Sequence, residues 1–248
     1  MKLLIGLILS KNYNNMKIKT LFILILDLTM TISLLFLMPY QVIIGEKGHE
    51  FAGMLMSTCF IVHIVMNKWW YKNLLNGKYN LFRFMQTIIN FAIMITMFSS
   101  MISGIMMSRH IFTLISVNTH IEISRVMHML AAYWGFLLMS FHLGLHWGMI
   151  FSHINKIMKL NKKLIVICRF VGFTLAVYGG YVFKELDLFS HMFLKKEYFF
   201  FDFNQSPLLV LFNYFSIMGL WIFIAHYFMK IIKSFQIKDL MKLNMRKV

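Results

Sequence analysis

Six long apolar runs constrain this chain more than any other feature of its sequence. They lie at roughly 19–44, 50–70, 84–108, 126–151, 164–183 and 207–232. Each is long enough to cross a bilayer, which takes about 18 apolar residues or more. Lipid offers the backbone no hydrogen-bond partner, so each run is expected to be helical. The sequence therefore predicts an all-α integral membrane protein, an up-down bundle of six transmembrane helices.

The composition excludes two other classes of protein. Charged residues make up 14% of the chain, whereas a soluble domain has about 25%, so a soluble domain is not expected. The net charge of +16 does not indicate a nucleic-acid partner. Its Lys and Arg residues recur between apolar runs instead of forming one patch or tail.

The distribution of the basic residues predicts the direction of the bundle. Of the 25 Lys and Arg residues, 19 lie before the first run, after the last run, or around the second and fourth loops. The alternate loops hold the other six. Loops rich in Lys and Arg stay on the cytoplasmic side. Both termini are therefore expected in the cytoplasm, as an even number of crossings requires.

Two pairs of histidines recur with one spacing. His49 and His63 belong to the second helix and His128 and His142 to the fourth, and each pair is fourteen residues apart. Fourteen steps of a helix leave two side chains about 40° apart on one face and about 21 Å apart along the axis. The second and fourth helices cross in the same direction. His49 is therefore expected at the depth of His128, and His63 near that of His142.

Histidines inside membrane spans are costly and usually functional. Haem iron accepts two axial imidazoles, and the apolar macrocycle fits between helices. The matched pairs predict two b-type haems stacked across the membrane, with iron ligands His49 and His128 on one side and His63 and His142 on the other. The chain has no C-x-x-C-H motif, so covalent c-type attachment is not expected.

His146 leaves one ligand open. It lies one turn after His142 and eighteen residues, a whole number of turns, after His128. Either His142 or His146 can therefore face His63, and the repeated spacing favours His142. The other histidine would support a ligand or line a quinone site.

Three charged residues are further candidates. Arg109 and Arg125 lie at the outer ends of the third and fourth helices, where they would bind haem propionates or anchor the helix ends. Asp27 is the one acidic residue in the core of a span. It would orient a ligand histidine, relay a proton to a quinone, or form a hydrogen bond between helices.

The remaining histidines carry weaker expectations. Those in the loops are expected to be solvated surface residues, and the role of His226 in the sixth helix stays open. The loop histidines are His110, His120, His153 and His191.

Several segments within residues 17–151 carry a resemblance to a known family. They read GEKGHEFAG, VHIVMNKWWYKNLLNGKY, SGIMMSR and RVMHMLAAYWGFLLMSFHLGLHWGMI. The chain resembles the flavinylation-associated membrane cytochromes, a bacterial family of dihaem, cytochrome-b-like proteins described as a domain of unknown function. The HLGLHWG and NKWWYKNL strings are the most specific parts of the match.

The resemblance implies a division of the chain and a location. Residues 17–155 would form a four-helix haem-binding core, preceded by an N-terminal extension at 1–16. Residues 156–248 would add two transmembrane helices and an aromatic segment at 184–206 outside the membrane. The membrane would be the bacterial cytoplasmic membrane.

The combined expectation is a membrane dihaem b-type cytochrome. The resemblance implies that it passes electrons toward an FMN-bearing or flavinylated extracytoplasmic protein. The donor would be a quinone or a cytoplasmic reductase, so a bound quinone is the further cofactor to consider. The alternative is a haem-free transporter or structural subunit that uses the intramembrane histidines and Asp27.

Overall fold

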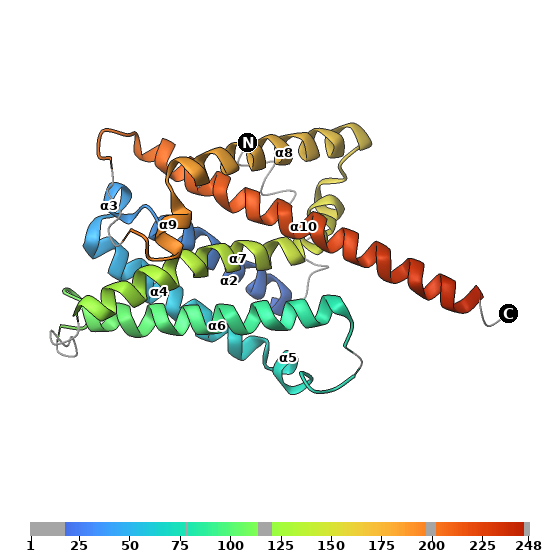
Figure 1. Ribbon diagram of the computed structural model, residues 1–248, viewed down its shortest axis with the longest axis horizontal. Helices are drawn as coiled ribbons and strands as arrows, with labels where there is room; N and C mark the ends of the chain where they lie inside the picture. Colours follow the sequence, from blue (N-terminus) through green and yellow to red (C-terminus); the bar gives the residue numbers. More distant parts are fainter. Residues whose placement is uncertain (1–17, 78, 114–120, 197–201, 246–248) are drawn as a thin grey trace.

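The computed structural model describes residues 18–77, 79–113, 121–196 and 202–245. Every regular element in these residues is a helix. Six of the helices are long and apolar enough to cross a membrane, and they run along the long axis of the molecule (Figure 1). The predicted all-α membrane bundle is therefore confirmed.

Three of the connections between the spanning helices each contain a short helix. The six long helices are α2 (Ile18–Leu37), α4 (Gly45–Met66), α6 (Leu81–Met107), α7 (Ile121–Met158), α8 (Lys162–Glu185) and α10 (Pro207–Met245). The short helices are α3 (Tyr40–Ile43), α5 (Lys68–Lys72) and α9 (Leu188–Met192).

The first connection differs from the hydropathy pattern. The first apolar run was expected to reach residue 44, but α2 ends at Leu37 because Pro39 lacks an N–H and disfavours helical backbone in the residue before it. After α3, Gly45 takes a φ of +65°, which an L side chain rarely adopts. The chain turns there into α4. As a result, His49 and His63 lie on one unbroken helix.

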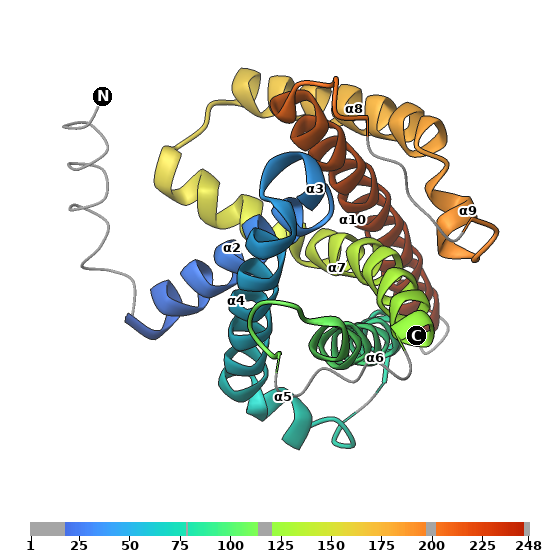
Figure 2. The ribbon, with the colours of Figure 1, turned by 90° about the vertical axis from the view of Figure 1, so that its left-hand side faces the viewer.

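The helices do not contact one another equally. The closest neighbours are α6 with α7, α10 with both α7 and α8, and α2 with α4. By contrast, α4 approaches α6 only loosely and hardly meets the backbone of α7. The end-on view in Figure 2 shows α4 beside α2, with α6 and α7 forming a separate pair. Helices α4 and α7 therefore contact each other mainly through side chains.

Two glycines allow α10 to lie close to its neighbours. A Cβ atom added to Gly144 of α7 would come within 2.6 Å of the Ile222 carbonyl oxygen. A Cβ atom at Gly179 of α8 would come within 2.0 Å of the Ser216 carbonyl oxygen. Small residues at such positions are a common means of packing helices in membranes. Through this packing, α10 shares a buried apolar cluster with α2, α4, α6 and α7.

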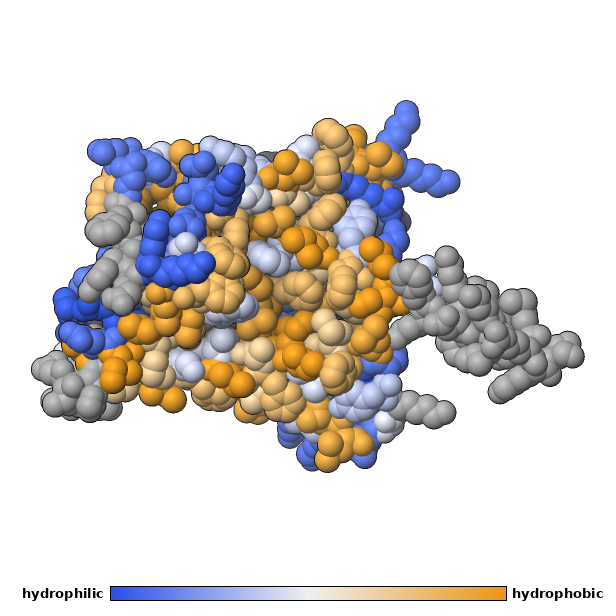
Figure 3. Space-filling model, viewed as in Figure 1, coloured by the Kyte–Doolittle hydropathy of each residue, from blue (hydrophilic) through white to orange (hydrophobic). Residues whose placement is uncertain are grey.

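The surface has the pattern expected of a protein in contact with lipid. Figure 3 shows a broad apolar belt between two ends where hydrophilic residues gather. Large apolar side chains within the belt are exposed, among them Ile95 and Phe170 at 67% each. Burying this area in hydrocarbon is favourable at about 25 cal/mol per Å².

We predict that Gly179→Ala destabilises the protein by about 1–3 kcal/mol, because the added methyl group meets the backbone of α10. Gly180→Ala is the matched control, since a Cβ there has nothing within 4 Å. It should be neutral or stabilising, because alanine favours the helix. Thermal unfolding of both variants in detergent checks this, and equal effects would contradict the packing described.

Candidate functional site

Two layers of histidines lie inside the bundle. The layer that the sequence predicts on the outer side, called the outer layer, contains His49 from α4 and His128 from α7, whose ring centroids are 5.9 Å apart with the planes at 75°. The ring of Tyr40 lies 4.3 Å from that of His49. The contact crosses between the two helices whose backbones hardly meet. The fold thus brings together two rings from distant parts of the chain.

The third spanning helix holds the ring of His128. Nδ1 of His128 lies 3.1 Å from the Ser100 carbonyl oxygen and 3.1 Å from the Ser103 hydroxyl oxygen, both on α6. The Nδ1–H therefore donates to α6, which leaves Nε2 as the ring nitrogen free to bind a ligand. Gly104 permits the close approach, because a Cβ there would lie 3.4 Å from Cε1 of His128.

The inner layer begins with an Asp–His pair between α2 and α4. Nδ1 of His63 lies 2.8 Å from a carboxylate oxygen of Asp27, so the ring N–H donates to the carboxylate. Protein atoms leave 28% of the His63 side chain and 42% of the Asp27 side chain uncovered. Both residues belong to spanning helices, where lipid cannot solvate a charge. The pair thus presents a polar surface suited to a bound group.

His142 and His146 both lie near this pair. Their ring centroids are 4.8 Å apart, and each lies within electrostatic range of His63. The Gln86 side-chain nitrogen is 3.3 Å from Nε2 of His146. A ring nitrogen that already has a hydrogen-bond partner must give it up to bind a metal. His142 is therefore the less encumbered of the two candidates, as the repeated spacing also favours.

Buried polar atoms without a hydrogen-bond partner are few among the described residues. They are Nδ1 of His49, Nδ1 of His142, the Asn90 side-chain oxygen and Nε1 of Trp221. Folded proteins leave few such atoms, and each calls for an explanation. Two of the four are ring nitrogens of the histidine layers, which could therefore bind a further group.

Glu50 is an important residue that the sequence reasoning missed. Its carboxylate accepts hydrogen bonds from the Ser108 hydroxyl at 2.7 Å and from three successive backbone N–H groups. Those groups belong to residues 109–111, at 2.8, 3.1 and 3.0 Å. Glu50 thereby fastens the loop after α6 onto α4, directly beside His49. Nothing in the local sequence identifies these partners, because they lie almost sixty residues away.

The two arginines proposed for propionates have different surroundings. The Arg109 guanidinium lies 3.7 Å from the Glu46 carboxylate, and both side chains are largely exposed. Arg125 lies near the start of α7 with its side chain exposed. Both residues thus lie at the end of the bundle nearest His49 and His128.

The expectation for His191 was wrong. Its side chain is only 4% exposed and stacks on the ring of Tyr133 at 5.5 Å and 22°. The reason is that α9 folds back onto α7, where Nε1 of Trp134 donates to the Met192 carbonyl at 2.9 Å. His110 and His153 are exposed as expected, while His120 lies outside the described residues.

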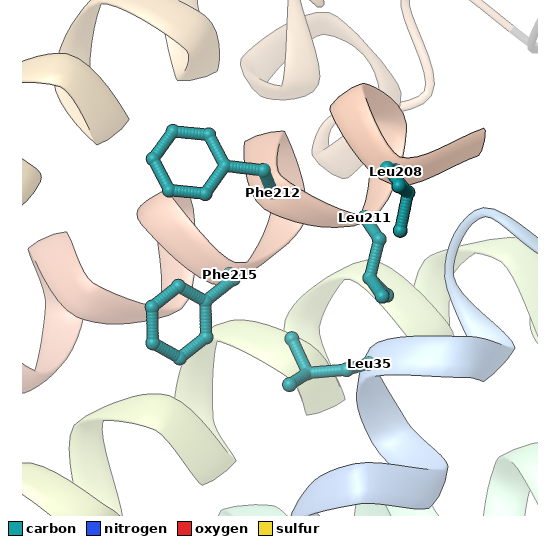
Figure 4. Close-up of a pocket in the computed structure, with 5 residues that line it drawn as sticks. All are labelled: Leu35, Leu208, Leu211, Phe212 and Phe215. Atoms are coloured by element: carbon teal, nitrogen blue, oxygen red, sulfur yellow. The ribbon is translucent and has the colours of Figure 1, made fainter. Parts of the chain in front are cut away.

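The described residues line two hollows at the surface of the bundle. One, of about 280 Å³, lies between α2 and α10 and is lined only by leucine and phenylalanine side chains (Figure 4). The other, of about 320 Å³, lies between α7 and α10 and includes His146 and His226 in its lining. The first offers only apolar contact, whereas the second adjoins the inner layer.

Within the described residues, no group of three or more His, Cys, Asp or Glu side chains could hold a metal ion. A pair of imidazoles suits a metal that brings its other ligands with it. Comparisons with protein-family models, with curated proteins and with solved structures gave no match. The resemblance to the flavinylation-associated cytochromes therefore stays a hypothesis that depends on the quoted motifs.

We predict that Glu50→Gln loosens the loop that follows α6. An amide has one acceptor oxygen in place of two, and its NH₂ group opposes the backbone donors of residues 109–111. Hydrogen exchange of these amides should become faster, because the free energy of opening the loop falls by about 1–3 kcal/mol. Glu46→Gln is the control, because an exposed ion pair contributes about 0–1 kcal/mol. Unchanged exchange in Glu50→Gln would contradict the role assigned to its carboxylate.

We predict that α9 detaches more readily at acidic pH. Burial lowers the pKa of His191 below its ordinary value of 6.5, so the undocked segment takes up a proton before the docked one does. Docking is therefore fully stable above 6.5 and weakens as the pH falls below that value. Hydrogen exchange of residues 188–196 across this range should show the change. His191→Phe, which keeps a ring against Tyr133, should remove it.

Proposed function

We propose that this protein is a membrane dihaem b-type cytochrome that passes electrons across the bacterial cytoplasmic membrane. The electrons would pass between a quinone or a cytoplasmic reductase and an extracytoplasmic flavoprotein, with both termini of the chain in the cytoplasm. The basic residues beside the inner layer support this orientation.

The separation of the outer histidine rings carries the proposal. A bond of about 2 Å from a metal to each ring nitrogen places two imidazole centroids on opposite sides of the metal about 6 Å apart. The rings of His49 and His128 are 5.9 Å apart. This separation matches the one expected for two imidazoles that bind one iron.

The surroundings of the rings add support. A histidine that binds a metal usually donates its other ring N–H to a carbonyl or carboxylate oxygen. His128 has the Ser100 carbonyl in this position, and His63 has the Asp27 carboxylate. The Ser100 carbonyl belongs to α6, which packs on α7, and the Asp27 carboxylate belongs to α2, which packs on α4. The scant backbone contact between α4 and α7 suits a plate held between them.

Each residue has a distinct part in the proposed site. His49 with His128, and His63 with His142, would hold one haem each, with His146 as the alternative to His142. When bound, haem supplies one-electron transfer. Asp27 would fix the ring orientation of His63 by accepting a hydrogen bond from its Nδ1–H. Arg109 and Arg125 are the cations available for propionates at the outer end.

The spacing of the layers suits passage across the membrane. The histidines of each pair are about 21 Å apart along their helices, within a hydrocarbon core of about 30 Å. Between the layers lies a cluster of buried apolar side chains that includes Phe60 and Met97. This cluster would exclude water from the space between the two proposed haems and keep its polarity low.

A haem-free transporter is the second candidate, favoured by the Asp27–His63 pair alone. An intramembrane carboxylate bonded to a histidine is a common element of proton relays. This function gives no reason for the second layer, where His49 and His128 face each other and His128 donates to a carbonyl oxygen.

We predict that the purified protein contains about two b-type haems per chain. The reduced-minus-oxidised absorption spectrum and a pyridine haemochrome assay measure them. His49→Ala and His128→Ala should each reduce the content to about one, since either change leaves the outer iron without a ligand. His153→Ala is the matched control, because that histidine is exposed and bonds only its own helix. A well-folded protein without haem would overturn the proposal.

A further inference from the structure

The hollow between α7 and α10 has features of a binding site. It measures about 320 Å³, and the start of α6 completes it. Its apolar side consists of Phe82, Leu145 and Met149, and its polar side includes His146, His226 and Lys233. A small pocket that combines an apolar wall with a few polar groups is typical of a site for a small organic molecule.

The position of the hollow connects it to the inner layer. His146 belongs both to the lining and to the inner layer, where its ring is 4.8 Å from that of His142. His226 faces it from α10, so that the two histidines contribute to the hollow from two different helices. A molecule bound here therefore lies next to the ligands proposed for the inner haem.

The lysines indicate what kind of molecule fits. The Lys233 ammonium lies 4.5 Å from the centre of the Phe82 ring, and the Lys230 ammonium lies 5.9 Å from that of Tyr227. Each cation thus has its own aromatic partner. A site for a phosphate would bring both cations together on one anion. The lining suits a neutral, planar molecule better than a lipid phosphate.

We propose that this hollow binds the head group of a quinone. The ring of a quinone is flat and apolar, and its two carbonyl oxygens accept hydrogen bonds at opposite ends, where His146 and His226 would donate. Gly148 has no side chain to fill the hollow, and a Cβ there would lie 3.9 Å from Cε1 of His226. The proposal rests on the proposed function, because it names the molecule that would exchange electrons with the inner haem.

The test measures binding of a fluorescent hydroxyquinoline N-oxide, a quinone analogue, to the purified full-length protein in detergent. Binding should quench the fluorescence saturably, at about one molecule per chain. Gly148→Leu places a side chain in the hollow and should weaken binding about tenfold or more. Gly172→Leu is the matched control, because a Cβ at Gly172 of α8 has nothing within 4 Å. It should bind as the unchanged protein does.

A second variant guards against a folding defect in Gly148→Leu. His226→Phe removes a hydrogen-bond donor from α10 and should also weaken binding, with the unfolding temperature checking that the variant is folded. Absence of saturable quenching in the unchanged protein would overturn the proposal. Equal binding by Gly148→Leu and Gly172→Leu would overturn it as well.

Two further measurements separate this site from its neighbours. Displacement of the analogue by phosphatidylglycerol, but not by a short-chain quinone, would assign the hollow to a lipid and overturn the proposal. Loss of haem in Gly148→Leu would assign the hollow to the inner haem, with the same consequence. Saturable binding by protein that contains no haem would support the quinone site while contradicting the cytochrome. The failures of the two proposals are thus distinguishable.

Discussion

Hydrocarbon offers no hydrogen bonds, and the arrangement of polar side chains in this bundle depends on that fact. Three histidines in the spanning helices have a hydrogen-bond partner that comes from another helix. His63 has the carboxylate of Asp27 on α2, His128 has the carbonyl of Ser100 on α6, and His146 has the amide of Gln86 on α6. These contacts tie α4 to α2 and α7 to α6. They also set which ring nitrogens remain available.

Two helix pairs face each other across a region of little backbone contact. Helices α6 and α7 form one close pair and α2 and α4 the other. The rings of His49 and His128 bridge between the pairs at 5.9 Å. A metal between them would account both for their separation and for the unpartnered Nδ1 of His49.

The sixth spanning helix adds a second level of organisation. Its close approach at Gly144, a residue that lines the hollow, places α10 against α7 two residues from His142. Ala225 and Met229 of α10 then join the buried cluster of the first four spanning helices. The part of the chain that the resemblance treats as an addition is therefore packed directly against the inner histidine layer. Without α10, that side of His146 would face lipid.

The sequence by itself determined the helices and which histidines share a helix face. Hydropathy gives the six spans, and the periodicity of a helix places residues fourteen apart on one face, since both are local properties of the chain. Local pattern also failed where a distant surface intervenes, as for His191, which became buried when α9 folded onto α7. The tertiary structure alone decided the partners of Asp27 and Glu50, the support of His128 and the hollow beside His146. Such contacts join residues from different helices, and their distances follow from how whole helices pack, which no local pattern encodes.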